Sequence, residues 1–268
     1  MLAVILPAIL LAIGRPQVIL GCGMPPAPER LFVSGAGPHT WSAPSGDNFH
    51  IRSELYLENG AKEPSNPAHM VLLDADIVLH NDPKVKKFDQ LSRKTDSYVH
   101  YLRNHCNDRR RLLVIVFQMH PRYLVLTFAV DDGAAPSASG ALLDSLFSSS
   151  AWGDDECAQR FKMLPRLANF SIPFYNVNQP VLIASRLSTT FYRTGDLVEI
   201  DIDVFSSRIA RWIYRYVESA AASLEVDLGF VLQGNSRQEL PERILGAVHL
   251  SRVNLAERVT RTSAWPVE

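Results

Sequence analysis

The clearest pattern in the chain is a series of short apolar runs separated by turn-forming residues. Residues 112–118 (LLVIVFQ) and 123–130 (YLVLTFAV) are rich in β-branched and aromatic side chains and lie close together in the sequence. This composition predicts a β-hairpin. Both runs are apolar at nearly every position, so we expect both faces of the sheet to be covered there.

A second hairpin is predicted over residues 181–204, with its turn at 194–196 (TGD). Residues 197–204 alternate between apolar and acidic positions, which places the two kinds of side chain on opposite faces of a strand. The acidic face carries Glu199, Asp201 and Asp203.

Three neighbouring carboxylates need compensation, because uncompensated buried charge is costly. We therefore predict a structural ion-pair network that joins Glu199, Asp201 and Asp203 to Arg186 of the partner strand. Arg208 or Arg211 of the next segment are further candidate partners. The alternatives for this acidic face are a hard-cation site and acid–base chemistry.

The residues that follow have the periodicity of an amphipathic helix. Apolar side chains recur at helical spacing on one side: Ile209, Trp212, Ile213, Tyr216, Val217, Ala220 and Leu224. Arg208, Arg211 and Arg215 share another side, which is either a solvated face or a surface for anionic lipid. Ser206 or Ser207 can cap the helix.

The remaining elements complete the prediction of the fold. Further strands are predicted at 49–52, 69–79, 226–232 and 244–253, and helical segments at 84–111, 141–147 and 157–164. Strands in hairpins with a few helices between them predict an α+β fold. We expect a mostly antiparallel curved sheet packed by a long amphipathic helix and shorter helices.

The N-terminal region is distinct from the rest. Residues 2–13 (LAVILPAILLAI) suit the apolar core of a signal or short anchor, although no basic residue precedes them. A buried element or a wrongly chosen start are the alternatives. The predicted organisation is a candidate signal or anchor segment (1–23), a Pro/Gly-rich linker (24–40), one domain (41–255) and a tail (256–268). A signal or anchor implies a membrane-associated or secretory location, and its absence a cytoplasmic one.

Composition excludes several classes of protein. The 268-residue chain is 47% apolar and 21% charged, which is typical of globular proteins, and its net charge is −1. Without a basic surplus, nucleic-acid binding is not expected. Three cysteines are too few for a disulfide framework or a zinc ribbon. Phosphate-loop, dinucleotide and nucleophile-elbow motifs do not occur in the sequence, so we predict no enzyme, catalytic residue, cofactor or metal.

Four ordered motifs in the second half carry a family resemblance. They are 153–155 with 160–165 (GDD, RFKMLP), 192–193 with 199–207 (YR, EIDIDVFSS), 226–234 (VDLGFVLQG) and 239–246 (ELPERILG). Their order and spacing resemble the C-terminal domain of the plant enhanced-disease-resistance-2 proteins. Residues 41–57 resemble the opening of that domain, so the resemblance covers about 41–255. It departs from the family at Thr194, inserted between an arginine and a glycine, and at His249, where arginine is common.

The resemblance implies a function of limited definition. In the plant proteins this domain follows a pleckstrin-homology domain and a START lipid-transfer domain, and those proteins resemble membrane-associated, lipid-linked negative regulators of defence and cell death. This chain is similar to stand-alone members of the family, so functions of the upstream domains are not transferred. We predict a non-enzymatic, lipid- or membrane-associated regulatory module. A protein-interaction module is the alternative, and a carboxylate-dependent enzyme is less favoured. Oligomeric state stays open.

Two sets of residues are candidates for contact with a lipid headgroup, an anionic membrane or a protein partner. The ligand-binding candidates are Arg160, Lys162, Arg193, Arg208, Arg211 and Arg215. The loop motif consists of Glu239, Pro241, Glu242 and Arg243, which form either a ligand loop or a structural anchor. An apolar cavity would favour lipid, an exposed apolar patch a protein partner, and acids converging in a cleft an enzyme.

Overall fold

The computed structural model describes residues 33–79, 89–95, 97–131, 138–167, 176–253 and 260–261. The candidate signal or anchor segment (1–23) lies outside the described residues. Of the predicted linker and tail, only 33–40 and 260–261 are described.

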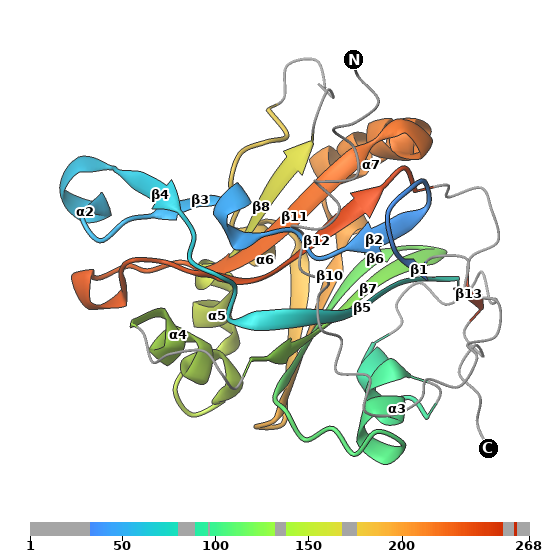
Figure 1. Ribbon diagram of the computed structural model, residues 1–268, viewed down its shortest axis with the longest axis horizontal. Helices are drawn as coiled ribbons and strands as arrows, with labels where there is room; N and C mark the ends of the chain where they lie inside the picture. The colour runs from blue at the N-terminus through green and yellow to red at the C-terminus, as the bar shows by residue number, and fades with distance from the viewer. Residues whose placement is uncertain are drawn as a thin grey trace, which may run out of the picture.

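Two sheets form the body of the protein (Figure 1). In spatial order, the five-stranded sheet contains β1 (Val33–Ser34), β2 (Thr40–Ser42), β12 (Ile244–Ser251), β11 (Glu225–Leu232) and β8 (Phe161–Leu167). The six-stranded sheet contains β13 (Thr260–Arg261), β5 (Met70–Leu79), β7 (Arg122–Val130), β6 (Leu112–Met119), β10 (Leu197–Asp203) and β9 (Ser188–Arg193). A small ribbon pairs β3 (His50–Arg52) with β4 (Lys62–Pro64).

The predicted α+β class and the mostly antiparallel pairing are confirmed. Both predicted hairpins form, β6 with β7 and β9 with β10. The two hairpins join through a parallel pairing of β6 with β10. The sequence pattern did not indicate this pairing, because each hairpin is specified locally and the contact between hairpins is not.

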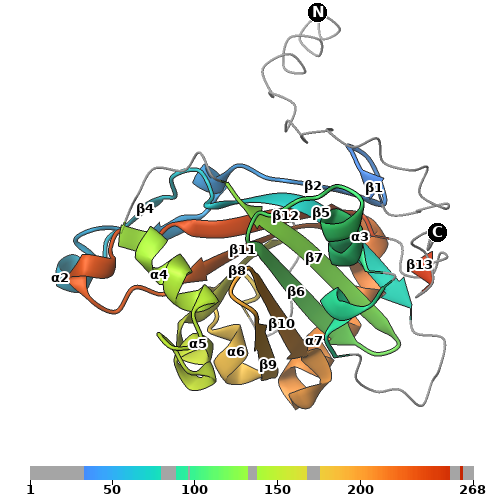
Figure 2. The ribbon, with the colours of Figure 1, turned by 90° about the horizontal axis from the view of Figure 1, so that it is seen from below.

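The main core lies between the two sheets, which face each other (Figure 2). Phe230 of β11 is fully buried at its centre and stacks on Phe161 of β8 at 5.8 Å between ring centroids. Across the core, its ring centroid lies 6.2 Å from that of Phe117 and 6.0 Å from that of Phe128. Aromatic packing at these distances stabilises the contact between sheets.

A second core covers the outer face of the six-stranded sheet. A short 3-10 turn, η2 (Leu91–Arg93), and helix α3 (Tyr98–Asn104) lie over β6 and β7. Leu91, Val99 and Leu102 pack there against the outward side chains of β6. The expectation that both faces are covered at this hairpin is therefore confirmed.

The helical segments differ from the prediction in extent. Helix α4 (Ala138–Phe147) contains the predicted 141–147 segment. In the 84–111 region, the described residues form a helix only at η2 and α3.

The helical turn predicted at 157–164 is confirmed for 157–160 and wrong for 161–164. Helix α5 (Asp154–Arg160) ends before Phe161, where the chain becomes strand β8 and pairs with β11. Pro165 lies within that strand, and β8 is at the edge of its sheet, where a missing amide hydrogen is tolerated. The first half of the predicted 181–193 strand is instead helix α6 (Ile183–Arg186).

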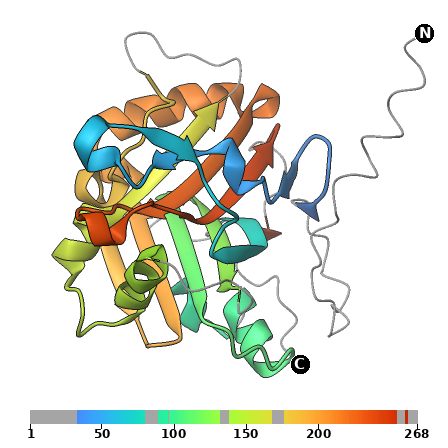
Figure 3. The same cartoon turned by 60° about the vertical axis from the view of Figure 1, so that its left-hand side comes forward.

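Helix α7 (Arg208–Ala220) is the longest helix described and runs along one side of the molecule (Figure 3). The hydroxyl of Ser207 accepts a hydrogen bond from the amide of Ala210 at 3.4 Å, which confirms the predicted cap. No residue of α7 is buried. None of the helices in the described part of the chain has the length and apolar character needed to cross a membrane.

Candidate functional site

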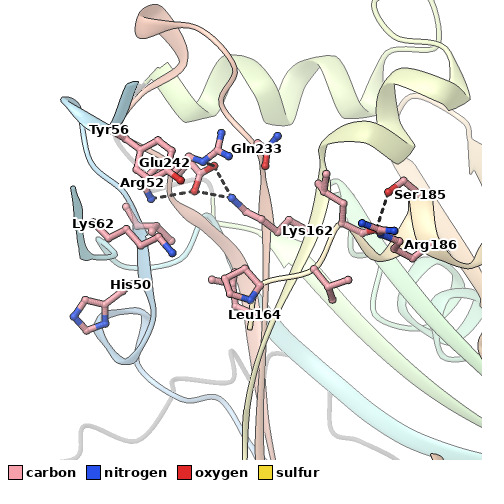
Figure 4. Close-up of a pocket in the computed structure, with 14 residues that line it drawn as sticks. His50, Arg52, Tyr56, Lys62, Lys162, Leu164, Ser185, Arg186, Gln233 and Glu242 are labelled. Carbon is pink, nitrogen blue, oxygen red and sulfur yellow. Dashed lines mark hydrogen bonds and ion pairs between the residues drawn. The ribbon is translucent and has the colours of Figure 1, made fainter. Parts of the chain in front are cut away.

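A cavity of about 400 Å³ opens between the β3–β4 ribbon and the edge strand β8 (Figure 4). Helix α6 closes it from the other side. Most of its polar lining is basic or hydrogen-bonding: His50, Arg52, Tyr56, Lys62, Lys162, Arg186, Gln233 and Glu242. We call this cavity the basic pocket.

The floor of the basic pocket is a buried ion pair. Nζ of Lys162, on β8, lies 2.7 Å from Oε1 and 3.0 Å from Oε2 of Glu242. The Glu242 side chain is 1% exposed and that of Lys162 is 9% exposed. Two backbone amides, of Arg52 and Gly234, also donate to the Glu242 carboxylate, at 3.1 and 3.2 Å. The carboxylate is thus fully compensated, as a buried charge requires.

Arg52 connects this floor to the rim. Its Nη1 donates to the carbonyl of Gly234 at 2.9 Å, and its Nε lies 3.7 Å from Oε1 of Glu242. The guanidinium also stacks over the ring of Tyr56, 4.5 Å from the centroid. These contacts fix the β3 strand against the loop that follows β11.

The rim carries side chains that are available to a ligand. Within the described ranges, the side chains of His50, Lys62 and Arg186 make no hydrogen bond or ion pair. Lys62 and Arg186 are exposed at the mouth of the pocket, where Figure 4 shows them on opposite sides of Lys162. The site therefore offers unused donors around a fixed floor.

The pocket carries a positive charge. Four cationic side chains (Arg52, Lys62, Lys162 and Arg186) face one carboxylate, Glu242. Burial lowers the pKa of Lys162, and the charges of Arg52 and Lys62 act in the same direction, while Glu242 opposes them. A concave site with this charge attracts anions, and guanidinium and ammonium groups are good partners for phosphate.

Two of the predicted ligand-binding arginines lie outside the pocket and are engaged by the protein. Arg160 forms ion pairs with Glu156 and Glu239 and stacks over Trp152. Arg193 donates to the carbonyl of Trp152 at 2.7 Å and to Asp154 at 2.6 Å. Both guanidinium groups hold the α5 region in place. Of the six predicted ligand-binding residues, only Lys162 lines the pocket.

The loop motif has several structural roles. Glu239 forms a capping box with Ser236, Pro241 follows a cis peptide bond, and Glu242 enters the pocket. Arg243 donates to the carbonyls of Pro67 and Ala68. Of the four residues, only Glu242 reaches the candidate site.

The predicted ion-pair network does not form among the described residues. The carboxylate of Glu199 accepts from the amides of Leu91 and Ser92 at 2.7 and 3.0 Å, and from the Ser92 hydroxyl. The amide of Gln90 donates to Asp201 at 3.3 Å. Backbone amides of the η2 turn therefore compensate Glu199, whereas the amide of Gln90, just before that turn, reaches one oxygen of Asp201.

The other members of that network lie elsewhere. Asp203 caps the 3-10 turn η3 (Val204–Ser206) by accepting from the amide of Phe205 at 2.9 Å. Arg186 is at the end of α6, not on a strand that pairs with β10, so it faces the basic pocket. The prediction was wrong here because it assumed that β9 begins at 181.

The buried acids are electrostatically unusual. Glu199 is 0% and Asp201 3% exposed. Burial, together with the neighbouring Glu199 carboxylate, raises the pKa of Asp201 to about 9. In the described part of the chain, no group of three or more His, Cys, Asp or Glu side chains has a metal-binding arrangement.

The three arginines of α7 also lie outside the pocket. Arg208, Arg211 and Arg215 are exposed on the helix, and Arg211 donates to the carbonyl of Phe205. Sequence reasoning missed several pocket residues, namely His50, Arg52, Tyr56, Lys62 and Gln233. His50, Arg52 and Tyr56 lie in the opening motif (41–57), and Gln233 is the next-to-last residue of the third motif (226–234), which is the only signal that could have pointed to these four residues.

Two comparisons with known proteins bear on the family of this chain. The family model described as "Protein ENHANCED DISEASE RESISTANCE 2, C-terminal" matches residues 41–254. A relative from Arabidopsis thaliana, "Protein ENHANCED DISEASE RESISTANCE 2-like", is 26% identical over 225 residues, which are 82% of this chain and 29% of the relative. The chain thus spans less than a third of the length of that relative.

Proposed function

Because this chain belongs to the family of the C-terminal domain of the protein ENHANCED DISEASE RESISTANCE 2, we propose that it is a non-enzymatic, membrane-associated regulatory module. In this proposal the basic pocket holds the phosphorylated headgroup of an anionic lipid. The observation that carries it is the excess of cations in the pocket, four against one carboxylate.

The geometry of the pocket favours a headgroup over an acyl chain. Its volume of about 400 Å³ is within the usual range for small-ligand sites. Its lining, however, is largely polar and basic, whereas an acyl chain would need an apolar cavity. A phosphate could be bound by Lys62 and Arg186 at the rim, and Tyr56 and Gln233 could then hydrogen-bond with hydroxyl groups of the headgroup.

The floor of the pocket supports binding rather than chemistry. The oxygens of Glu242 accept from Lys162 and from two backbone amides. A carboxylate that is engaged in this way is a poor general base, because its lone pairs are already used. Lys162 is correspondingly held in an ion pair and is not a free nucleophile.

The proposal can be tested with soluble headgroups, without a membrane. Inositol 1,4-bisphosphate and glycerol 3-phosphate would be titrated calorimetrically into the whole chain. We expect saturable binding that weakens with salt. The double variant Lys62→Glu/Arg186→Glu reverses two rim charges. Neither side chain makes a hydrogen bond or ion pair within the described residues, so the variant should abolish binding while the protein stays folded.

Arg93→Glu is the matched control, because Arg93 is an exposed arginine of the η2 turn outside the pocket. It should bind like the unaltered protein. If neither phosphate binds, or if Arg93→Glu weakens binding as much as the rim variant, the pocket does not hold a headgroup.

A further inference from the structure

Helix α7 exposes an apolar face that is not covered by the rest of the protein. Ile209, Trp212 and Tyr216 are 61%, 38% and 39% exposed, and they are three of the five large apolar side chains with such exposure among the described residues. Their spacing places them in one sector of the helix. Trp212 and Tyr216 contact each other edge to face at 4.8 Å, which makes the surface continuous.

The opposite side of α7 attaches the helix to the body of the protein. The ring of Tyr214 packs edge to face on Phe205 of η3 at 5.1 Å. Glu218 accepts from Nη1 of Arg122 on β7 at 2.9 Å. Tyr214 also donates to Glu218 at 3.2 Å. The exposed apolar side chains therefore cannot turn inward, because the inner side already has its partners.

The charges on α7 are arranged for an external anion. Arg208, Arg211 and Arg215 occupy the sector next to the exposed apolar one. Arg208 and Arg215 make no ion pair with any residue in the described ranges. The helix has no acidic residue in its first turn, although cations at a helix N-terminus are unfavourable. Its one carboxylate, Glu218, is paired with Arg122.

We propose that this face of α7 docks onto the surface of an anionic lipid bilayer. Trp212 and Tyr216 would lie at the headgroup level, where aromatic side chains with a polar edge are favoured. Ile209 would reach the upper acyl region, and the arginines would contact lipid phosphates. An amphipathic helix with an aromatic side and a basic side is typical of binding in the plane of the interface.

The charge on this face argues for a bilayer over a second copy of the chain. Two copies that met through α7 would bring their arginines together. An anionic membrane instead supplies negative charge along the whole length of the helix. None of the residues lining the basic pocket is on α7, so this inference does not rest on the headgroup proposal.

Co-sedimentation with vesicles tests the docking. Phosphatidylcholine vesicles with and without phosphatidylserine would be mixed with the whole chain. We expect binding only to the anionic vesicles, and a loss of at least about tenfold in affinity for Trp212→Ser/Tyr216→Ser. Leu55→Ser/Leu57→Ser is the matched control, because these leucines are 44% and 52% exposed and lie outside α7. Arg208→Glu/Arg215→Glu should abolish binding.

Depth quenching supplies a readout that does not depend on affinity. Brominated lipids in anionic vesicles should quench part of the tryptophan fluorescence, and Trp212→Phe should remove that part. Equal binding of the two serine double variants, or quenching that survives Trp212→Phe, would overturn the proposal. Concentration-dependent dimerisation that Trp212→Ser/Tyr216→Ser abolishes, without vesicle binding, would instead assign the face to a second copy. If the soluble headgroups do not bind the basic pocket, only the proposed function fails. The vesicle and quenching results would still decide the docking of α7.

Discussion

The ammonium of Lys162 on β8 lies 2.7 Å from Oε1 of Glu242, which approaches from the loop before β12. The two residues are 80 positions apart in the sequence, and both are buried. The pair therefore ties an edge strand to a distant loop at the base of the basic pocket. The two charges are compensated unequally, because the Glu242 carboxylate accepts from two backbone amides in addition to the Lys162 ammonium.

This asymmetry predicts different costs for the two single substitutions. Glu242→Gln leaves the Lys162 ammonium buried without its counter-charge, and should lower the free energy of unfolding by about 3 kcal/mol. Lys162→Met leaves Glu242 with two backbone amides and Arg52, so we expect a smaller loss, of about 1–2 kcal/mol. Urea denaturation at neutral pH measures both.

The double variant Lys162→Met/Glu242→Gln is the internal control for this pair. It removes both charges, so its loss should be clearly less than the sum of the single losses. Strictly additive losses would mean that the two side chains do not interact in solution.

Asp201 predicts a dependence of stability on pH. Its pKa rises from 3.8 in the unfolded chain to about 9 in the folded protein. Between these values the folded state keeps a proton that the unfolded state releases, so the free energy of unfolding should fall as pH rises from about 4 to about 9. Asp201→Asn replaces the acid with a neutral group that can still accept from the amide of Gln90.

We expect Asp201→Asn to flatten this slope and to gain on the order of 1–3 kcal/mol at pH 9, the usual cost of a buried polar group without compensation. Urea denaturation at a series of pH values measures the effect. A slope that is unchanged in the variant would assign the pH dependence to other groups.

The strands were largely predictable from the sequence, because their patterns are local. Alternation over 197–204 and the apolar runs at 112–118 and 123–130 specify hairpins through neighbouring residues. The same local reasoning failed at 161–167, where the strand is defined by its pairing with β11, which is distant in sequence. It also gave no indication that β6 and β10 are parallel neighbours.

The candidate site was less predictable than the fold. Lys162 and Glu242 belong to recognised motifs, but their pairing depends on how the first motif and the fourth motif meet in space. Lys62 and Arg186 carry no motif at all. The acids of β10 were expected to find arginines, whereas backbone amides of the η2 turn took that role. Backbone N–H groups are present at every residue except proline, so a sequence does not reveal which of them will compensate a charge.

Gly246 of β12 is predicted to be intolerant of any side chain. A Cβ at this position would lie 2.5 Å from Cδ1 of Phe128 on the opposing sheet. Because the phenyl ring is buried in the main core, it cannot move aside without strain. Gly246→Ala should therefore lower the free energy of unfolding by about 1–3 kcal/mol, as measured by urea denaturation.

A smaller side chain at position 128 should relieve this clash. In the Phe128→Leu background, Gly246→Ala should cost much less than it does alone, since the added methyl then meets a shorter side chain. Equal costs in both backgrounds would show that the contact with Phe128 does not determine the need for glycine.

His249 predicts a second and distinct pH effect. Its Nδ1 lies 2.6 Å from Oδ1 of Asp227, and its Nε2 lies 3.0 Å from Oε2 of Glu225. The hydrogen bond with Asp227 is the main cause that raises the pKa of His249 above 6.5. The stabilisation from the charged imidazole is complete below about pH 6.5 and is lost as pH rises through the raised value.

His249→Arg should remove this loss, because arginine stays charged and can pair with both carboxylates. The groups are partly exposed, so we expect a difference of less than about 1 kcal/mol, measured as thermal stability between about pH 6 and pH 9. The effect is separable from that of Asp201, which already acts between about pH 4 and pH 6, where His249 is charged in both states. A His249→Arg variant that loses stability between about pH 6 and pH 9 as steeply as the unaltered protein would show that His249 does not control this part of the pH dependence.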